Sequence, residues 1–173
     1  MNDGIIGRAE PAGVVVPLRR PPIRQSTVVA SSAAHTFSVF TRRLAEWWPL
    51  TPFSYGGERV RHVSVEEWVG GDVSEVWDDG TTVSWGEVLE WTPPTALTMT
   101  WNITGTPTEV ALRFVQLAPS LTRVDLEHRG WERLSDAELD RDCALPGGYN
   151  GGAFQAGWTE ILGRLRTAAE RHT

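Results

Sequence analysis

The chain has 173 residues, enough for one domain with a hydrophobic core, and it carries a formal net charge of −6 with a sequence pI of about 5.2. This acidic balance, without a long basic run, argues against nucleic acid as a partner, because such binding depends on cationic side chains. The single Cys, Cys143, excludes an intrachain disulfide framework and Cys-based metal clusters, and no apolar run resembles a membrane span or a signal peptide, so a cytoplasmic protein is expected.

The N-terminal residues 1–22 are rich in Gly, Pro and Arg and show no clear period. We expect them to form a flexible extension. The domain itself is expected over residues 23–173. It opens with a strand, because β-branched residues are frequent between Gln25 and Ala30 and alternate with their neighbours.

A first helix is expected from Ala33 to Trp48. Ser31 and Ser32 are typical of a helix start, and Pro49 is typical of a helix end. A loop over residues 50–60 follows. The apolar stripe of this helix contains Phe37, Phe40, Leu44 and either Trp47 or Trp48.

From residue 61 to about residue 128 the apolar residues recur with a period of two. This pattern predicts short antiparallel strands with one apolar face, joined by tight turns such as Asp78–Thr81 and Thr104–Pro107. The residues predicted on the apolar face are Val73, Glu75, Trp77, Val83, Trp85, Glu87, Leu89, Trp91, Leu97, Met99, Trp101, Val110, Leu112, Phe114, Val124, Leu126 and His128.

The C-terminal part begins with an irregular segment, residues 129–150. Ser135 and Glu138 have the spacing of a capping box, which predicts a short helix from about Asp136 to Cys143. A glycine-rich run then leads into a long amphipathic helix over residues 151–173. Its apolar stripe contains Phe154, Trp158, Ile161, Leu162, Leu165 and Ala169.

These elements predict an α+β helix-grip fold. A curved antiparallel sheet of about seven strands wraps around the long C-terminal helix, and short helices follow the first strand. A helix held by a bent sheet need not touch it everywhere. A cavity for a small ligand is therefore expected between the two.

Six segments also carry a resemblance to a known family. They are FTRRLAEWWP at 40–49, EEWVGG at 66–71, Glu75 with DDG at 78–80, WGEVLEWTPP at 85–94, TRVDLEHRGWERL at 122–134 and GWTEIL at 157–162. In this order they resemble the branch of heat-shock-protein-90 ATPase activator homologues in the START-like, or SRPBCC, superfamily, which has the birch-pollen-allergen fold. The resemblance covers about residues 25–170. The superfamily that it resembles includes lipid and hormone carriers, polyketide cyclases and aromatases, and many bacterial members of unknown role. The name of the branch comes from a co-chaperone, but the resemblance by itself does not imply chaperone binding.

Three polar residues on the apolar face are candidates for contact with a ligand: Glu75, Glu87 and His128. A buried carboxylate is costly unless it is paired, so these residues are expected to serve a purpose if they face inward. The competing interpretation is that they lie at the open end of the sheet, or that a bulge turns them outward. His128 could also form an acid–base pair with one of the carboxylates.

Aromatic and Met side chains are the expected cavity walls. Nine Trp supply most of the aromatic surface, and indole suits both cavity walls and an ordinary core. The Trp47–Trp48 pair could form a lid or a simple hydrophobic plug. The full set of wall candidates is Trp47, Trp48, Trp85, Met99, Trp101, Phe114, Phe154 and Trp158.

The leading functional prediction is non-enzymatic binding of a small hydrophobic molecule, as a carrier or sensor. One alternative is a cyclase- or aromatase-like enzyme that uses the same cavity, and another is a protein-interaction module that regulates a chaperone. No cofactor and no metal are expected, since the motifs for phosphate cradles, nucleophile elbows and zinc sites are missing. A homodimer and a chaperone contact are left open as partners.

Overall fold

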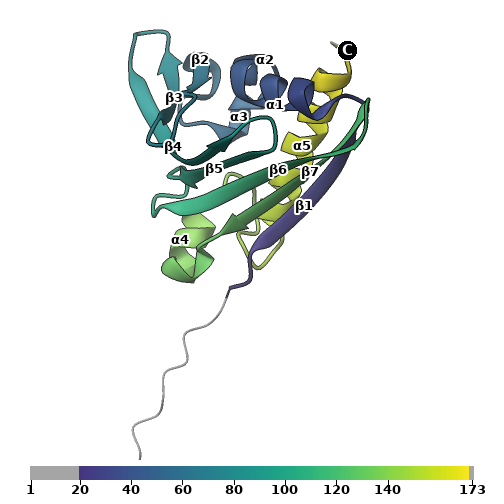
Figure 1. Cartoon of the computed structure of the whole chain (residues 1–173). Helices are drawn as coiled ribbons and strands as arrows, with labels where there is room; N and C mark the ends of the chain where they lie inside the picture. The colour runs from purple at the N-terminus through teal and green to yellow at the C-terminus, as the bar shows by residue number, and fades with distance from the viewer. Residues whose placement is uncertain (1–19, 172–173) are drawn as a thin grey trace, which may run out of the picture.

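The computed structural model describes residues 20–171, which form an antiparallel seven-stranded sheet with five α-helices (Figure 1). The strand order across the sheet is β1-β7-β6-β5-β4-β3-β2. The strands are β1 (Ile23–Val29), β2 (Val60–Val65), β3 (Asp72–Trp77), β4 (Thr82–Thr92), β5 (Ala96–Trp101), β6 (Thr108–Ala118) and β7 (Leu121–Arg129). The helices are α1 (Ala33–Arg42), α2 (Leu44–Trp47), α3 (Leu50–Phe53), α4 (Asp136–Arg141) and α5 (Ala153–Arg171).

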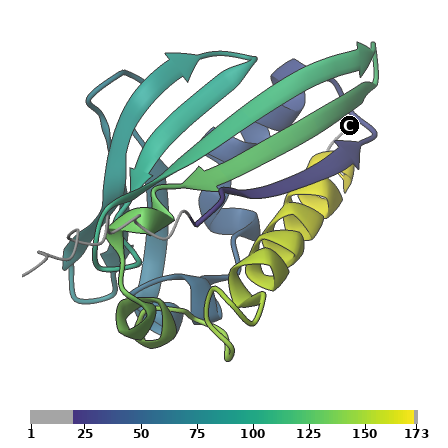
Figure 2. The ribbon, with the colours of Figure 1, turned by 90° about the horizontal axis from the view of Figure 1, so that it is seen from below.

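The long helix α5 lies along the concave side of the curved sheet, close to β1 (Figure 2). Its apolar stripe is buried, with Ile161, Leu162, Leu165 and Ala169 at 3% exposure or less. The predicted helix-grip fold is therefore confirmed. Of the predicted N-terminal extension, residues 1–19 lie outside the described part of the chain, and β1 begins at Ile23.

The predicted single helix over residues 33–48 is wrong in its continuity. The backbone leaves helical geometry at Arg43, with φ −119° and ψ 21°, and α2 starts directly after it. After this break, the two adjacent indoles of Trp47 and Trp48 are both buried. The Trp47 Nε1–H donates to the Val39 carbonyl at 3.0 Å, and the Trp48 Nε1–H donates to the Phe53 carbonyl at 2.8 Å.

A bulge in β4 changes which residues face the core. Val73 of β3 pairs with Gly86, whereas the next residue, Ser74, pairs with Ser84. Trp85 is therefore an extra residue on β4, and its side chain is buried. A bulge of this kind reverses the inward–outward alternation beyond it.

The inward orientation that simple alternation predicts for Glu87 and Leu89 is wrong for this reason, and for Glu87 the competing interpretation, a bulge that turns it outward, is confirmed. Val88 is fully buried, while Glu87 and Leu89 on either side of it are exposed. A second register shift after Val88 restores the alternation. Trp91 thus turns inward again and contacts Phe37 with ring centroids 5.2 Å apart.

Replacing Gly86 with Ala should disturb this bulge, because the strand approaches its neighbour closely here. A Cβ at Gly86 would lie 2.0 Å from the Thr100 carbonyl oxygen. We expect Gly86→Ala to lower the free energy of unfolding by about 2–3 kcal/mol in urea titrations. Gly163→Ala on α5 is the control, since nothing lies within 4 Å of its added methyl group and Ala favours a helix. Equal stability of the two variants would contradict the prediction.

Candidate functional site

A small cavity lies between the ends of β5 and β7, the start of α5 and the segment that joins α4 to α5. Its volume is about 50 Å³. Four of the predicted site residues line it: Trp101, His128, Phe154 and Trp158. The other lining residues include Phe53, Ile103, Thr104, Asp142, Cys143, Leu145, Ala153 and Ile161. The walls are mostly apolar, which is typical of a site for a hydrophobic ligand.

His128 is a buried polar residue of the cavity wall, with 1% exposure. The Trp158 indole can only donate, and its Nε1–H points to His128 Nδ1 at 3.0 Å. Nδ1 is therefore the acceptor, and the ring proton is on Nε2, which donates to Thr108 Oγ1 at 2.7 Å. The Thr108 hydroxyl in turn donates to the Trp101 carbonyl at 3.2 Å. Both imidazole nitrogens are thus satisfied by the protein.

Burial lowers the pKa of His128 from its ordinary value of 6.5 to about 3. The imidazole is therefore neutral at physiological pH, which agrees with the acceptor role of Nδ1. A base with such a low pKa has little tendency to take a proton at pH 7. His128 is suited to positioning Trp158 rather than to general base catalysis.

Glu75 is fully buried and accepts four N–H groups. Its Oε1 accepts from the Gly56 amide and the Trp77 indole, both at 2.6 Å. Its Oε2 accepts from the Trp85 indole at 2.7 Å and from the Tyr55 amide at 3.2 Å. A carboxylate is an acceptor at both oxygens, so the four donors satisfy it fully. Glu75 ties the segment after α3 to the sheet.

The structure does not bring Glu75 and His128 together. Each makes its polar contacts to other groups, and two indoles lie between them. The ring centroids of Trp85 and Trp101 are 6.0 Å apart, and those of Trp101 and His128 are also 6.0 Å apart. The predicted option of an acid–base pair is therefore not formed, and Glu87 is on the exposed face.

The remaining wall candidates lie in the hydrophobic core and do not line the cavity. They are Trp47, Trp48, Trp85, Met99 and Phe114. The core around Trp48 is closely packed with aromatic rings. The Trp48 ring contacts Trp85, Trp101 and Trp158 at centroid distances of 5.1–6.2 Å. The Trp47–Trp48 pair is buried as a plug rather than exposed as a lid.

Several cavity residues were not identified from the sequence. Phe53 comes from a segment expected to be a loop, and it packs against the helix at Gly157, where a Cβ would lie 3.0 Å from its ring. The predicted short helix from about Asp136 to Cys143 ends earlier, at Arg141, so Asp142 and Cys143 lie with Leu145 in the segment without regular structure that follows α4. Neither segment has a periodic pattern of apolar residues, so the sequence did not indicate that these residues lie at the cavity. Only the predicted capping box of Ser135, which the structure confirms, marked the neighbouring helix.

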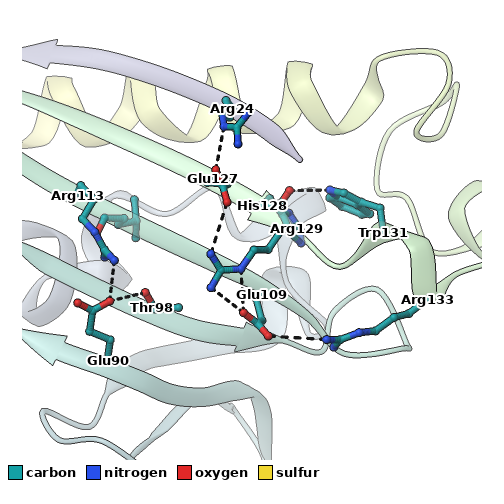
Figure 3. Close-up of polar contacts among 11 residues, drawn as sticks. Arg24, Glu90, Thr98, Glu109, Arg113, Glu127, His128, Arg129, Trp131 and Arg133 are labelled. Atoms are coloured by element: carbon teal, nitrogen blue, oxygen red, sulfur yellow. Dashed lines mark hydrogen bonds and ion pairs between the residues drawn. The ribbon is translucent and has the colours of Figure 1, made fainter. Parts of the chain in front are cut away.

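The convex side of the sheet carries many charged side chains, beside the exposed apolar residues Val28, Leu89, Val115 and Leu117. A chain of ion pairs crosses it from Arg24 through Glu127 and Arg129 to Glu109 and Arg133 (Figure 3). The same view shows His128 pointing to the opposite side of β7. Within residues 20–171, no group of three or more His, Cys, Asp or Glu side chains is placed to hold a metal ion. None of the helices in this part of the chain is both long and apolar enough to cross a membrane.

Comparison with known proteins supports the family resemblance. A family model described as activator of Hsp90 ATPase homolog 1-like protein matches residues 30–170. A search of curated proteins finds no match. Among solved structures, the anthrahydroquino-γ-pyrone synthase Txn09 is 31% identical, with a TM-score of 0.53, and the match covers 88% of this chain and 99% of that chain.

More distant structures share the fold alone. The self-sacrificing resistance protein CalC from Micromonospora echinospora is 22% identical, with a TM-score of 0.59 and coverage of 88% of this chain and 96% of that chain. An AHSA1-like protein from Aeromonas hydrophila is 15% identical, with a TM-score of 0.56 and coverage of 87% and 94%.

Proposed function

Because the chain belongs to the family of activator of Hsp90 ATPase homolog 1-like proteins, we propose that it binds a small hydrophobic molecule of the planar aromatic class. The binding site is the cavity between β5, β7 and α5. The observation that carries this proposal is the aromatic wall formed by Phe53, Trp101, Phe154 and Trp158. Aromatic walls favour flat ring systems through stacked and edge-to-face contacts.

The relative of 31% identity supports the ligand class. Its name describes a synthase of an anthrahydroquinone fused to a pyrone, which is a flat polycyclic aromatic system. The present cavity of about 50 Å³ is smaller than the ~300–1,000 Å³ of ordinary ligand sites. Binding therefore requires the α4–α5 segment to move outward. This segment contains no helix or strand, so it can open locally at a lower free-energy cost than the sheet.

A second candidate function is a ring-forming enzyme that acts in the same cavity. The identity to a synthase favours it. The low pKa of His128 argues against that residue as the general base in such a reaction. Turnover of a bound aromatic precursor, followed by mass spectrometry, separates the enzyme from a carrier.

Ligand binding is tested by thermal unfolding in the presence of anthraquinones, flavonoids, sterols and fatty acids. A ligand at 100 times its dissociation constant should stabilise the fold by about 2.7 kcal/mol, or roughly 5–10 °C in melting temperature. We expect this shift for the planar aromatic compounds. A flat response to every class would contradict the proposal.

Two matched substitutions on α5 locate the site. Ala153 lines the cavity, whereas Ala156, one turn along, is exposed. Ala153→Val should abolish the ligand-induced shift by filling the cavity, and Ala156→Val should keep it. If both variants respond like the natural chain, the ligand binds elsewhere.

A further inference from the structure

Asp142 is the charged residue of the cavity wall. It lies directly after α4, and among the lining residues it alone carries a formal charge at pH 7. Its side chain is only 15% exposed, although the residue lies in an irregular connecting segment. The proposed function leaves unexplained why a carboxylate borders an apolar cavity.

The other polar groups of the wall are already occupied. Both nitrogens of His128 are hydrogen-bonded within the protein. The Thr104 hydroxyl donates to the Thr106 carbonyl at 3.1 Å. Burial raises the pKa of the Cys143 thiol, so that group stays protonated and is a weak hydrogen-bonding partner. Of these groups only the Thr104 hydroxyl keeps an acceptor position, and it is a neutral acceptor, which is weaker than a carboxylate.

The Asp142 carboxylate keeps acceptor capacity. Arg141 contacts it in a bidentate manner, at 2.7 Å to Oδ1 and 2.9 Å to Oδ2. Each carboxylate oxygen has two acceptor positions, so one remains on each oxygen. Gly105 approaches this carboxylate closely, since a Cβ at that position would lie 2.8 Å from Oδ2, so a larger residue there would crowd the carboxylate.

The chemistry of this corner favours a neutral hydroxyl donor over a cation. Arg141 already balances the charge of Asp142, and a second cation would have to be desolvated next to the guanidinium group. A phenolic O–H donates to a carboxylate without adding charge, and such hydrogen bonds are short and strong. A phenol of the chain also lies in this region: burial and then the charges of Glu75 and Asp142 raise the pKa of Tyr55.

We propose that Asp142 recognises a phenolic hydroxyl group of the planar aromatic ligand and thereby sets the specificity of the cavity. This inference rests on the proposed function, because it concerns the same cavity. The aromatic side chains contact the ring system of the ligand. The hydroxyl group of the ligand donates a hydrogen bond to the Asp142 carboxylate. A hydroxylated aromatic compound should therefore bind better than its methyl ether.

The test compares 2-hydroxyanthraquinone with 2-methoxyanthraquinone at pH 6.5, by quenching of Trp fluorescence. The 2-hydroxyl makes no internal hydrogen bond to the quinone oxygen, so it is free to donate. We expect the natural chain to prefer the hydroxyl compound by about 10-fold or more, as a charge-assisted hydrogen bond provides. Asp142→Asn should reduce this preference to about 3-fold or less while the methoxy compound binds unchanged.

Asp140→Asn is the matched control, since Asp140 is exposed and does not line the cavity. It should keep the full preference. Equal binding of the two compounds by the natural chain, or an unchanged preference in Asp142→Asn, would overturn the role of Asp142 and leave ligand binding intact. Binding of neither compound would overturn this inference, and it would contradict the proposed function only if the wider panel is also flat. The comparison on the natural chain requires no variant to fold.

Discussion

Replacing Glu75 with Gln is expected to lower the free energy of unfolding by about 3–5 kcal/mol. The carboxylate is fully buried and accepts four N–H groups, two on each oxygen. A Gln amide has one oxygen and one NH₂ group, so its nitrogen would face two N–H donors. Those donors would be left buried without an acceptor, at about 1–3 kcal/mol each, and the hydrogen bonds to a charged group would be lost.

Glu87→Gln is the control for this substitution. Glu87 lies on the neighbouring strand, but its side chain is exposed, so its change should stay within about 0.5 kcal/mol. Urea titrations followed by Trp fluorescence give both values, and a thermal scan should show a decrease of roughly 10 °C for Glu75→Gln. A loss below 1 kcal/mol would show that the four hydrogen bonds do not hold the segment after α3 in solution.

Elements with long, regular apolar patterns were predicted correctly, because every apolar position in such a pattern has to be buried on the same face. The stripe of α5 has to be buried along its whole length, so an error at one position does not hide the period. The capping box of Ser135 was predicted for a different reason, since it depends only on residues within one turn of the helix. The inward direction of Glu75 and His128 also followed from alternation, and both are buried.

The failures lie where one residue changes the register. The bulge at Trp85 reverses the alternation, and the shift after Val88 restores it. The outer parts of β4 therefore agree with a regular strand, while Glu87 and Leu89 between them do not. Such paired shifts leave the overall period intact, so no pattern in the sequence separates them from a regular strand.

The residues that line the cavity could not be identified without knowledge of the tertiary contacts. Asp142 and Leu145 follow the end of α4 without any period, and only the fold brings them against α5. The wall residues Trp101 and Trp158 could be proposed from the sequence, but so could Trp85, which lies in the core. Sequence alternation separates inside from outside, yet it does not separate a filled core from a cavity.

The buried imidazole of His128 should make the stability of the fold depend on pH. Its pKa is about 3 in the folded chain and about 6.5 when exposed on unfolding. Between these values the unfolded chain binds a proton that the folded chain does not. The contribution of neutral, buried His128 to the free energy of unfolding is therefore complete above pH 6.5, and it is lost as the pH falls towards 3. Linkage gives a loss of about 2 kcal/mol between pH 7 and pH 5 from this group alone.

Urea titrations at pH 7 and pH 5 measure this loss, and paired variants assign it to the residue. His128→Gln removes the titrating group and should reduce the difference between the two pH values by about 2 kcal/mol. His62→Gln removes an exposed His and should leave the difference unchanged. The imidazole resonances of the natural chain provide a measurement that does not depend on folding of a variant. If the His128 ring titrates near pH 6.5 in the folded protein, then Nδ1 does not stay an acceptor for Trp158, and the cavity wall at His128 is open to water.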